Sequence, residues 1–180
     1  MKNNIIGRKS EQDTLARIYE SRQSEFVAVC GRHRVGKTFL VREYFEQEMV
    51  FQTSGLAGGN TQEQLKNFFY TLRRYDRNAT SVPHDWLDAF EMLITYLDSL
   101  NGIERKVVFL DELPWMDTAG SNFISALEHF WNGWASARRD IVLIVCGSAT
   151  SWMMDKLINN HGGLYGRLTH RLFLQPFSLG

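Results

Sequence analysis

The stretch Gly31-Arg32-His33-Arg34-Val35-Gly36-Lys37-Thr38 decides the fold of this chain. It fits the pattern G-x-x-x-x-G-K-[ST], a loop whose backbone N–H groups surround phosphate oxygens. The apolar run 26–30 precedes it, and a helical pattern over residues 37–48 follows it. Such a strand–loop–helix order points backbone N–H groups and the positive end of the helix at one small volume. The stretch therefore predicts a binding site for a nucleoside triphosphate.

Two side chains of this loop carry the expected chemistry. Lys37 would reach the β- and γ-phosphates, and the Thr38 hydroxyl would bind Mg²⁺. The other candidate cofactor-binding residues of the loop and of the first helical turn are Gly31, Arg32, Val35, Gly36 and Phe39. Arg34 receives no role, because its side chain can simply point into solvent.

A second motif lies at residues 106–112, where a hydrophobic strand ends in Asp111 and Glu112. A metal-bound triphosphate needs an acid beside the loop, and the end of a neighbouring parallel strand supplies that position. We therefore expect Asp111 to hold Mg²⁺, directly or through water, and Glu112 to polarise the attacking water. Alone, the Asp-Glu pair would be interpreted as a solvated turn, but the phosphate loop favours the catalytic interpretation.

Ser148 and Arg167 are two further candidates, and each has both a functional and a structural interpretation. Ser148 follows the apolar run 141–146, where its hydroxyl would touch the γ-phosphate or the attacking water, or would cap the next helix. Arg167 would stabilise charge on the γ-phosphate, in its own site or in a neighbour's, or would be a solvated surface residue. Spacing alone does not decide between these alternatives.

The composition fits one domain with a substantial core. Of 180 residues, 44% are hydrophobic, and 20 basic side chains balance 20 acidic ones. This balance offers no general nucleic-acid surface. The longest aliphatic run, 141–145, is too short to span a bilayer, and the first residues lack the apolar segment of a signal peptide, so we expect a cytoplasmic protein with no membrane contact. Cys30 and Cys146 are expected to be buried free thiols, and the histidines receive no metal role.

Strands and helices are expected to alternate along the chain. The predicted strands are 26–30, 49–53, 106–112, 141–146 and 171–175. The predicted helices are one opened by a capping box of Ser10 and Asp13, then 37–48, 61–75, one beginning at Pro83, 121–139 and 152–159. Strands without in–out alternation, separated by helices, indicate a parallel sheet buried on both faces. Ligands of such sheets bind at the carboxyl ends of the strands, where the candidate residues lie.

The ordered motifs resemble the archaeal-type ATPase family, which is related to the AAA+ and STAND P-loop ATPases. The matching segments are Ile6-Gly7-Arg8 with Glu11, then residues 29–38, 109–115, 146–148, 165–167 and 174–177. The resemblance covers nearly the whole chain, and the motifs occur in the order that the family has.

This resemblance implies an α/β fold, a P-loop NTPase three-layer αβα sandwich with a five-stranded, AAA+-like parallel sheet. The loop strand would lie between the Ser148 strand and the last strand, and the Asp111 strand would neighbour the Ser148 strand. The resemblance also places Ile6, Gly7 and Arg8 near the adenine. It gives Ser148 a sensor-1-like role and Arg167 an arginine-finger-like role.

Members of this family usually continue with a helical or winged-helix region, and often with a nuclease-like domain. We therefore expect residues 1–180 to be the ATPase core of a longer protein, with the lid and C-terminal domains absent and turnover slow. The hypothesis is an Mg²⁺-dependent ATP-binding and hydrolysing conformational switch. Its partners would be ATP or ADP, other copies of the chain, and DNA or protein bound through the missing regions. The alternatives are a scaffold that holds ADP or ATP with little turnover, and a kinase of a small metabolite.

Overall fold

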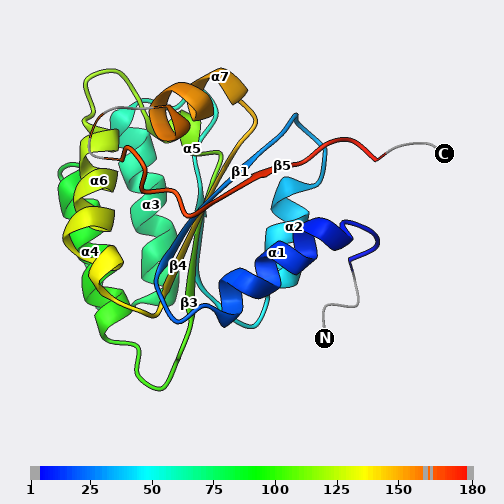
Figure 1. Ribbon diagram of the computed structural model, residues 1–180. Coiled ribbons are helices and arrows are strands. Elements are labelled where there is room, and N and C mark those ends of the chain that lie inside the picture. Colours follow the sequence, from blue (N-terminus) through cyan, green and yellow to red (C-terminus); the bar gives the residue numbers. More distant parts are fainter. Residues whose placement is uncertain (1–4, 160–161, 163, 178–180) are drawn as a thin grey trace.

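The computed structural model describes residues 5–159, 162 and 164–177, which form a five-stranded parallel sheet (Figure 1). The strand order is β2-β3-β4-β1-β5. The strands are β1 (Glu25–Cys30), β2 (Met49–Ser54), β3 (Lys106–Asp111), β4 (Ile141–Gly147) and β5 (His170–Phe173). The predicted fold class is confirmed. The loop strand β1 lies between β4 and β5, and β3 neighbours β4, as the family resemblance implied.

Helices cover both faces of the sheet, so the domain has three layers (Figure 1). One face carries α1 (Lys9–Glu20) and α2 (Lys37–Tyr44). The other carries α3 (Thr61–Tyr75), α4 (Trp86–Asp98) and α6 (Phe123–Gly133). Every residue of β1, β3 and β4 is buried, which explains why these strands lack in–out alternation in the sequence.

Short helices follow the strands at their carboxyl ends. The single turn α5 (Leu113–Met116) comes directly after β3, and α7 (Thr150–Met153) comes just after β4 and continues as a π-helix over Met154–Ile158. The sequence patterns did not predict α5. No helix within the described residues has the length and apolarity needed to cross a membrane.

The predicted capping box at Ser10 and Asp13 is wrong. Helix α1 begins at Lys9, after Arg8, which has a left-handed backbone (φ 56°), and no side chain caps it. Arg8 takes this conformation where its guanidinium donates to the Val35 carbonyl, a contact between segments far apart in the sequence. A capping box occurs instead at the start of α3, between Asn60 and Glu63.

Other predicted boundaries differ from the structure by several residues. The helix predicted over 121–139 ends at Gly133 and gives way to a 3₁₀ turn at Ala135–Ala137. Here Trp134 leaves helical geometry (φ −137°), and its ring lies 4.7 Å from the Arg138 guanidinium carbon. The helix predicted from Pro83 begins three residues later, after Asp85, whose carboxylate accepts from the backbone N–H of Asp88.

The remaining differences lie at the ends of elements. Helix α2 ends at Tyr44 rather than at residue 48, β3 ends at Asp111, and β5 spans 170–173 rather than 171–175. The helix predicted over 152–159 begins at Thr150.

A partly buried cluster of charged side chains connects the amino ends of β3 and β4. The Lys106 ammonium is buried and lies 2.6 Å from Asp140 Oδ2, and the Arg138 guanidinium donates to both oxygens of Asp140 and to Asp98. Burial raises the pKa of the Asp140 carboxyl, but the hydrogen bonds from Arg138 and Lys106 outweigh it and bring that pKa down to about 2. The carboxylate form of Asp140 therefore stabilises this end of the sheet.

Replacing Asp140 by Asn should lower the free energy of unfolding by about 1.5–3 kcal/mol at pH 7, because it removes an ionic acceptor from a buried ammonium. The pKa of Asp140 is about 2 in the folded chain, below its ordinary 3.8, so its contribution is complete above about pH 4. It should disappear as the pH falls through about 2. Urea denaturation at several pH values measures this difference.

The matched control is Asp98→Asn, which removes a carboxylate that is half exposed. An exposed pair contributes about 1 kcal/mol at most, so this variant should stay close to the parent. Equal losses in the two variants would contradict the assignment.

Candidate functional site

The predicted phosphate loop connects β1 to α2 at the carboxyl ends of the strands. Gly36 precedes α2 with a left-handed backbone (φ 95°), and no other heavy atom lies within 4 Å of where its Cβ would be. Gly31 has φ 155°, and a Cβ there would lie 2.8 Å from the Leu174 carbonyl oxygen. The first glycine therefore allows β1 to approach the segment after β5, and the second leaves open space at the start of the helix.

Lys37 is a buried cation held by the loop itself. Its Nζ donates to the carbonyls of Gly31, at 2.9 Å, and of Arg32, at 2.7 Å. An ammonium has three N–H groups, so these two bonds leave one donor for a phosphate oxygen. The Arg32 side chain is exposed, and its contribution here is the backbone carbonyl.

Thr38 and Asp111 meet, although one lies on α2 and the other at the end of β3. Thr38 Oγ1 donates to Asp111 Oδ2 over 2.6 Å, and Asp111 Oδ1 accepts from the backbone N–H of Glu112 over 2.8 Å. One hydroxyl and one carboxylate fit Mg²⁺, which takes few protein ligands and completes its shell with phosphates and water. The described residues contain no group of three or more His, Cys, Asp or Glu side chains placed to hold a metal without a phosphate.

Glu112 has a left-handed backbone (φ 49°) between β3 and α5. Its carbonyl closely approaches Gly55, where a Cβ would lie 2.5 Å from it. The residue lines a pocket of about 300 Å³. The lining residues are His33, Glu112, Pro114, Trp115, Ser148, Ala149 and Trp152. The pocket brings Glu112 and Ser148 to one space beside the loop.

His33 is a site residue that the sequence did not reveal. Its Nε2 lies 2.9 Å from Ser148 Oγ, so the loop and the end of β4 are joined by a hydrogen bond. These residues are 115 positions apart, and only the adjacency of β1 and β4 brings them together. His33 occupies one of the x positions of the loop pattern, which admit any residue type, so the pattern gave it no role.

A second pocket, of about 250 Å³, is lined in part by the last residues of the loop and shares no residue with the first pocket. It is lined by Ile5, Ile6, Arg8, Val35, Gly36, Phe39, Leu40 and Phe177. Three predicted groups therefore meet here: the segment assigned to adenine, the loop and the first turn of α2. Gly7 lies between two of the lining residues. Phe177 was part of the resemblance but was not assigned to the site.

Arg167 stands apart from these contacts. It is exposed in the turn that precedes β5, and its backbone N–H donates to the Leu164 carbonyl. Within the described part of the chain, its side chain makes no hydrogen bond or ion pair with another site residue. The structure therefore does not bring Arg167 to Glu112 or Ser148.

The two cysteines are free and buried, as predicted. Burial raises the pKa of the Cys30 thiol to about 11. Burial also raises the pKa of the Cys146 thiol, and the Asp111 carboxylate, which is hydrogen-bonded to it, raises it further. Both thiols are therefore protonated at neutral pH.

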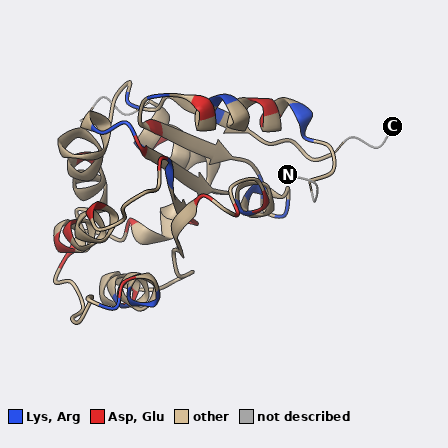
Figure 2. Ribbon diagram, turned by 90° about the horizontal axis from the view of Figure 1, so that it is seen from below, with Lys and Arg blue, Asp and Glu red and all other residues tan. Residues whose placement is uncertain are grey.

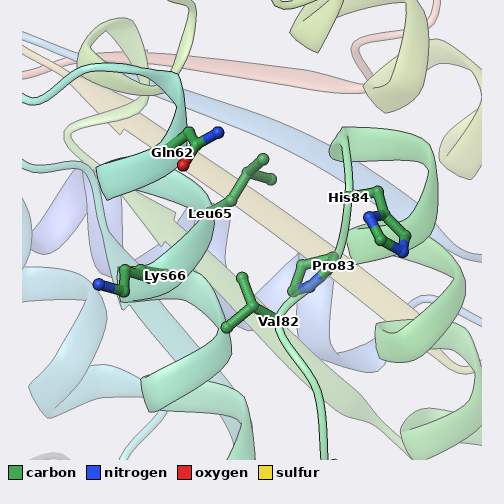
Figure 3. Close-up of a pocket in the computed structure, with 6 residues that line it drawn as sticks. All are labelled: Gln62, Leu65, Lys66, Val82, Pro83 and His84. Atoms are coloured by element: carbon green, nitrogen blue, oxygen red, sulfur yellow. The ribbon is translucent and has the colours of Figure 1, made fainter.

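A third pocket lies in the outer helical layer, between α3 and the segment before α4 (Figure 3). Its volume is about 320 Å³, and its lining residues are Gln62, Leu65, Lys66, Val82, Pro83 and His84. No residue of the phosphate loop lines it, so it is separate from the site described above.

The fold and the site together define a P-loop nucleotide-binding domain with an AAA+-type sheet. A family model for an AAA domain matches residues 20–152, and this chain belongs to that family. This family agrees with the AAA+-like class of P-loop domain that the ordered motifs indicated.

Similar proteins include an uncharacterized protein of Methanocaldococcus jannaschii, 25% identical over 96% of this chain and 36% of its own length. Among solved structures, a Walker-type ATPase of Pyrococcus abyssi superposes with a TM-score of 0.67 and 18% identity, over 97% of this chain and 55% of that one. Drosophila ORC bound to DNA gives 0.68 and 16%, over 98% and 45%. Cdc6p of Pyrobaculum aerophilum gives 0.58 and 15%, over 95% and 46%.

At these identities the solved structures show a shared fold. The chain spans about a third of the curated relative and about half of each solved chain. The similarity therefore does not assign the activities or partners of those longer proteins to this chain.

Replacing Gly31 by Ala should lower the free energy of unfolding by about 2–5 kcal/mol, since it adds left-handed strain to a clash with the Leu174 carbonyl. The clash would also weaken the hydrogen bond from the Leu174 N–H to the Cys30 carbonyl, which keeps this segment beside β1. Urea denaturation measures the loss. The control is Gly58→Ala, which has positive φ but open space around its Cβ and should cost about 1 kcal/mol. Equal losses would contradict a steric role for Gly31.

Proposed function

We propose that this domain binds ATP with Mg²⁺, hydrolyses it and acts as a conformational switch. The observation that carries the proposal is the contact between Thr38 and Asp111. It joins the phosphate loop to the acidic end of β3 at the point where a metal-bound triphosphate needs two oxygen ligands. The buried Lys37 beside them supplies the positive charge that such a ligand requires.

The loop residues bind and orient the nucleotide. The backbone N–H groups of residues 31–38 and the start of α2 face the phosphates, and Lys37 donates to the β- and γ-phosphates. Thr38 and Asp111 would hold Mg²⁺, which neutralises charge on the phosphate oxygens when it is bound. Ile6, Gly7 and Arg8 flank the space for the base.

Glu112 and Ser148 handle the attacking water. Glu112 accepts a proton from the water, and Ser148 orients the water or the γ-phosphate. His33 fixes the Ser148 hydroxyl through their hydrogen bond, so the loop and β4 change together when a phosphate competes for that hydroxyl. The short helix α5 begins directly after Glu112 and α7 begins two residues after Ser148, and these are the elements that would move.

Arg167 completes the proposal as the residue that stabilises charge on the γ-phosphate. Its exposed position in a turn suits an arginine that serves the site of a neighbouring copy. The domain would then work as a homo-oligomer.

We also propose a DNA or protein partner, because a conformational change driven by the nucleotide has an effect only if another molecule responds to it. Acidic and basic residues are interspersed along the helices (Figure 2), and the net charge is zero, so the described domain offers no broad surface for a polyanion.

Replacing Lys37 by Ala should weaken the binding of a non-hydrolysable ATP analogue with Mg²⁺ by about 10- to 100-fold, because a charge-assisted hydrogen bond is lost. Isothermal titration calorimetry measures this change, and thermal denaturation checks that the variant is folded. The control Lys66→Ala removes an exposed lysine of α3 and should bind like the parent. Unchanged affinity in Lys37→Ala would reject the proposed site.

Replacing Glu112 by Gln should leave this binding unchanged and reduce phosphate release in single-turnover measurements by at least about 100-fold, as the loss of a general base does. Glu91→Gln, on the exposed face of α4, is the control. Equal rates in the variant and the parent would remove Glu112 from the mechanism. Tight binding with no release by the parent, with or without added DNA, would favour the scaffold that holds ADP or ATP. Phosphate found on a metabolite instead of water would favour a kinase.

A further inference from the structure

The pocket between Ile6 and Phe177 has an unusually apolar rim for a surface hollow. Ile6 is 86% exposed, Phe39 52% and Phe177 64%. The three come from different segments: the one before α1, the first turn of α2 and the one after β5. Apolar side chains from separate segments that gather around one hollow mark a place where an apolar surface is covered by a ligand.

Phe177 rests on the segment that the resemblance assigned to adenine. The Arg8 guanidinium carbon lies 4.3 Å from the centre of the Phe177 ring, a cation–π distance. The ring also packs against Gly7, where a Cβ would lie only 3.2 Å from it, and Gly7 has φ 76°. The backbone at Gly7 is thus shaped to admit the aromatic ring.

Arg8 links this ring to the phosphate loop. Its Nη2 donates to the Val35 carbonyl over 2.8 Å, and its Nη1 lies 3.8 Å from Glu11 Oε1. Two contacts therefore hold the guanidinium plane, and Phe177 packs on it from the segment after β5, which lies outside any helix or strand. A flat base that enters the pocket would meet an aromatic ring that packs on a held guanidinium.

The side chains that line the pocket determine which interactions can recognise such a base. None of the eight residues that line the pocket has a carboxylate, an amide or a hydroxyl group, and Arg8 is the one with hydrogen-bonding atoms on its side chain. These side chains can therefore recognise a base through its stacking area rather than through hydrogen bonds. Stacking area separates two-ring purines from one-ring pyrimidines.

We propose that Phe177 stacks on the base of the bound nucleotide and makes the site selective for purine over pyrimidine nucleotides. Phe177 is then a specificity-determining residue, contributed by the segment after β5 and separate from the residues that act on the phosphates. This inference rests on the proposed function, because it takes the phosphates to lie in the loop at residues 31–38.

The test compares Mg²⁺ complexes of three ligands by isothermal titration calorimetry: a non-hydrolysable ATP analogue, its CTP counterpart and inorganic tripolyphosphate, which has no base. The parent should bind the ATP analogue at least about tenfold more tightly than the CTP analogue. In Phe177→Ala, affinity for the ATP analogue should fall about tenfold, affinity for tripolyphosphate should not change, and Phe177→Trp should restore the ATP affinity.

The matched control is Phe173→Ala. It removes an aromatic side chain from β5 that is 46% exposed and does not line the pocket, so purine affinity should stay at the parent value. An unchanged ATP affinity in Phe177→Ala, or an equal loss for ATP and tripolyphosphate, would overturn the stacking role and leave the ATP site standing. A parent that bound neither the ATP analogue nor tripolyphosphate would overturn the proposed function and this inference together.

Discussion

The rest of the site depends on one hydrogen bond that passes over the end of a strand. Thr38 lies in the first turn of α2, just after the strand β1 and the phosphate loop, and Asp111 is the last residue of β3. In the sheet, β4 lies between β1 and β3, so the bond joins segments that are not adjacent. The bond can form because β4 ends in small residues. Cys146 is buried beside Asp111, whose carboxylate raises the pKa of the thiol, and a Cβ at Gly147 would lie 2.8 Å from Pro114 Cδ and 2.9 Å from Met153 Sδ. A larger side chain at Gly147 would displace Pro114 of α5 or Met153 of α7, the short helices that follow β3 and β4.

The sequence was informative wherever a role depends on neighbouring residues. The loop glycines, Lys37 and the Asp-Glu pair were found because each lies within a short segment whose flanking strand and helix are encoded beside it. The strand order came from the family resemblance, since strand pattern alone does not say which parallel neighbour a strand takes. Its confirmation placed β4 where Ser148 can face the loop.

What the sequence missed was set by contacts between distant segments. Arg8 rather than Ser10 precedes the first helical residue, and its guanidinium bonds to Val35, 27 residues away; His33 contacts Ser148, 115 residues away. Neither contact has a local signature. Trp134 likewise ends α6 in geometry that its helical pattern did not predict. Local propensity therefore determined which elements form, while tertiary contacts determined where they end.

The two pockets beside the loop differ in the polar side chains that line them, and this difference bears on how a nucleotide would lie in the site. Both pockets are lined mostly by apolar atoms, but Arg8 is the one hydrogen-bonding side chain in the lining of the pocket at Phe177, whereas Glu112, His33 and Ser148 line the other pocket. A base suits the first because it buries stacking area there, and a water under attack suits the second because it needs a proton acceptor. The loop would then hold the phosphates with the terminal one toward Glu112. The presence of Glu112 and Ser148 in one of the two pockets is the feature that would orient the nucleotide.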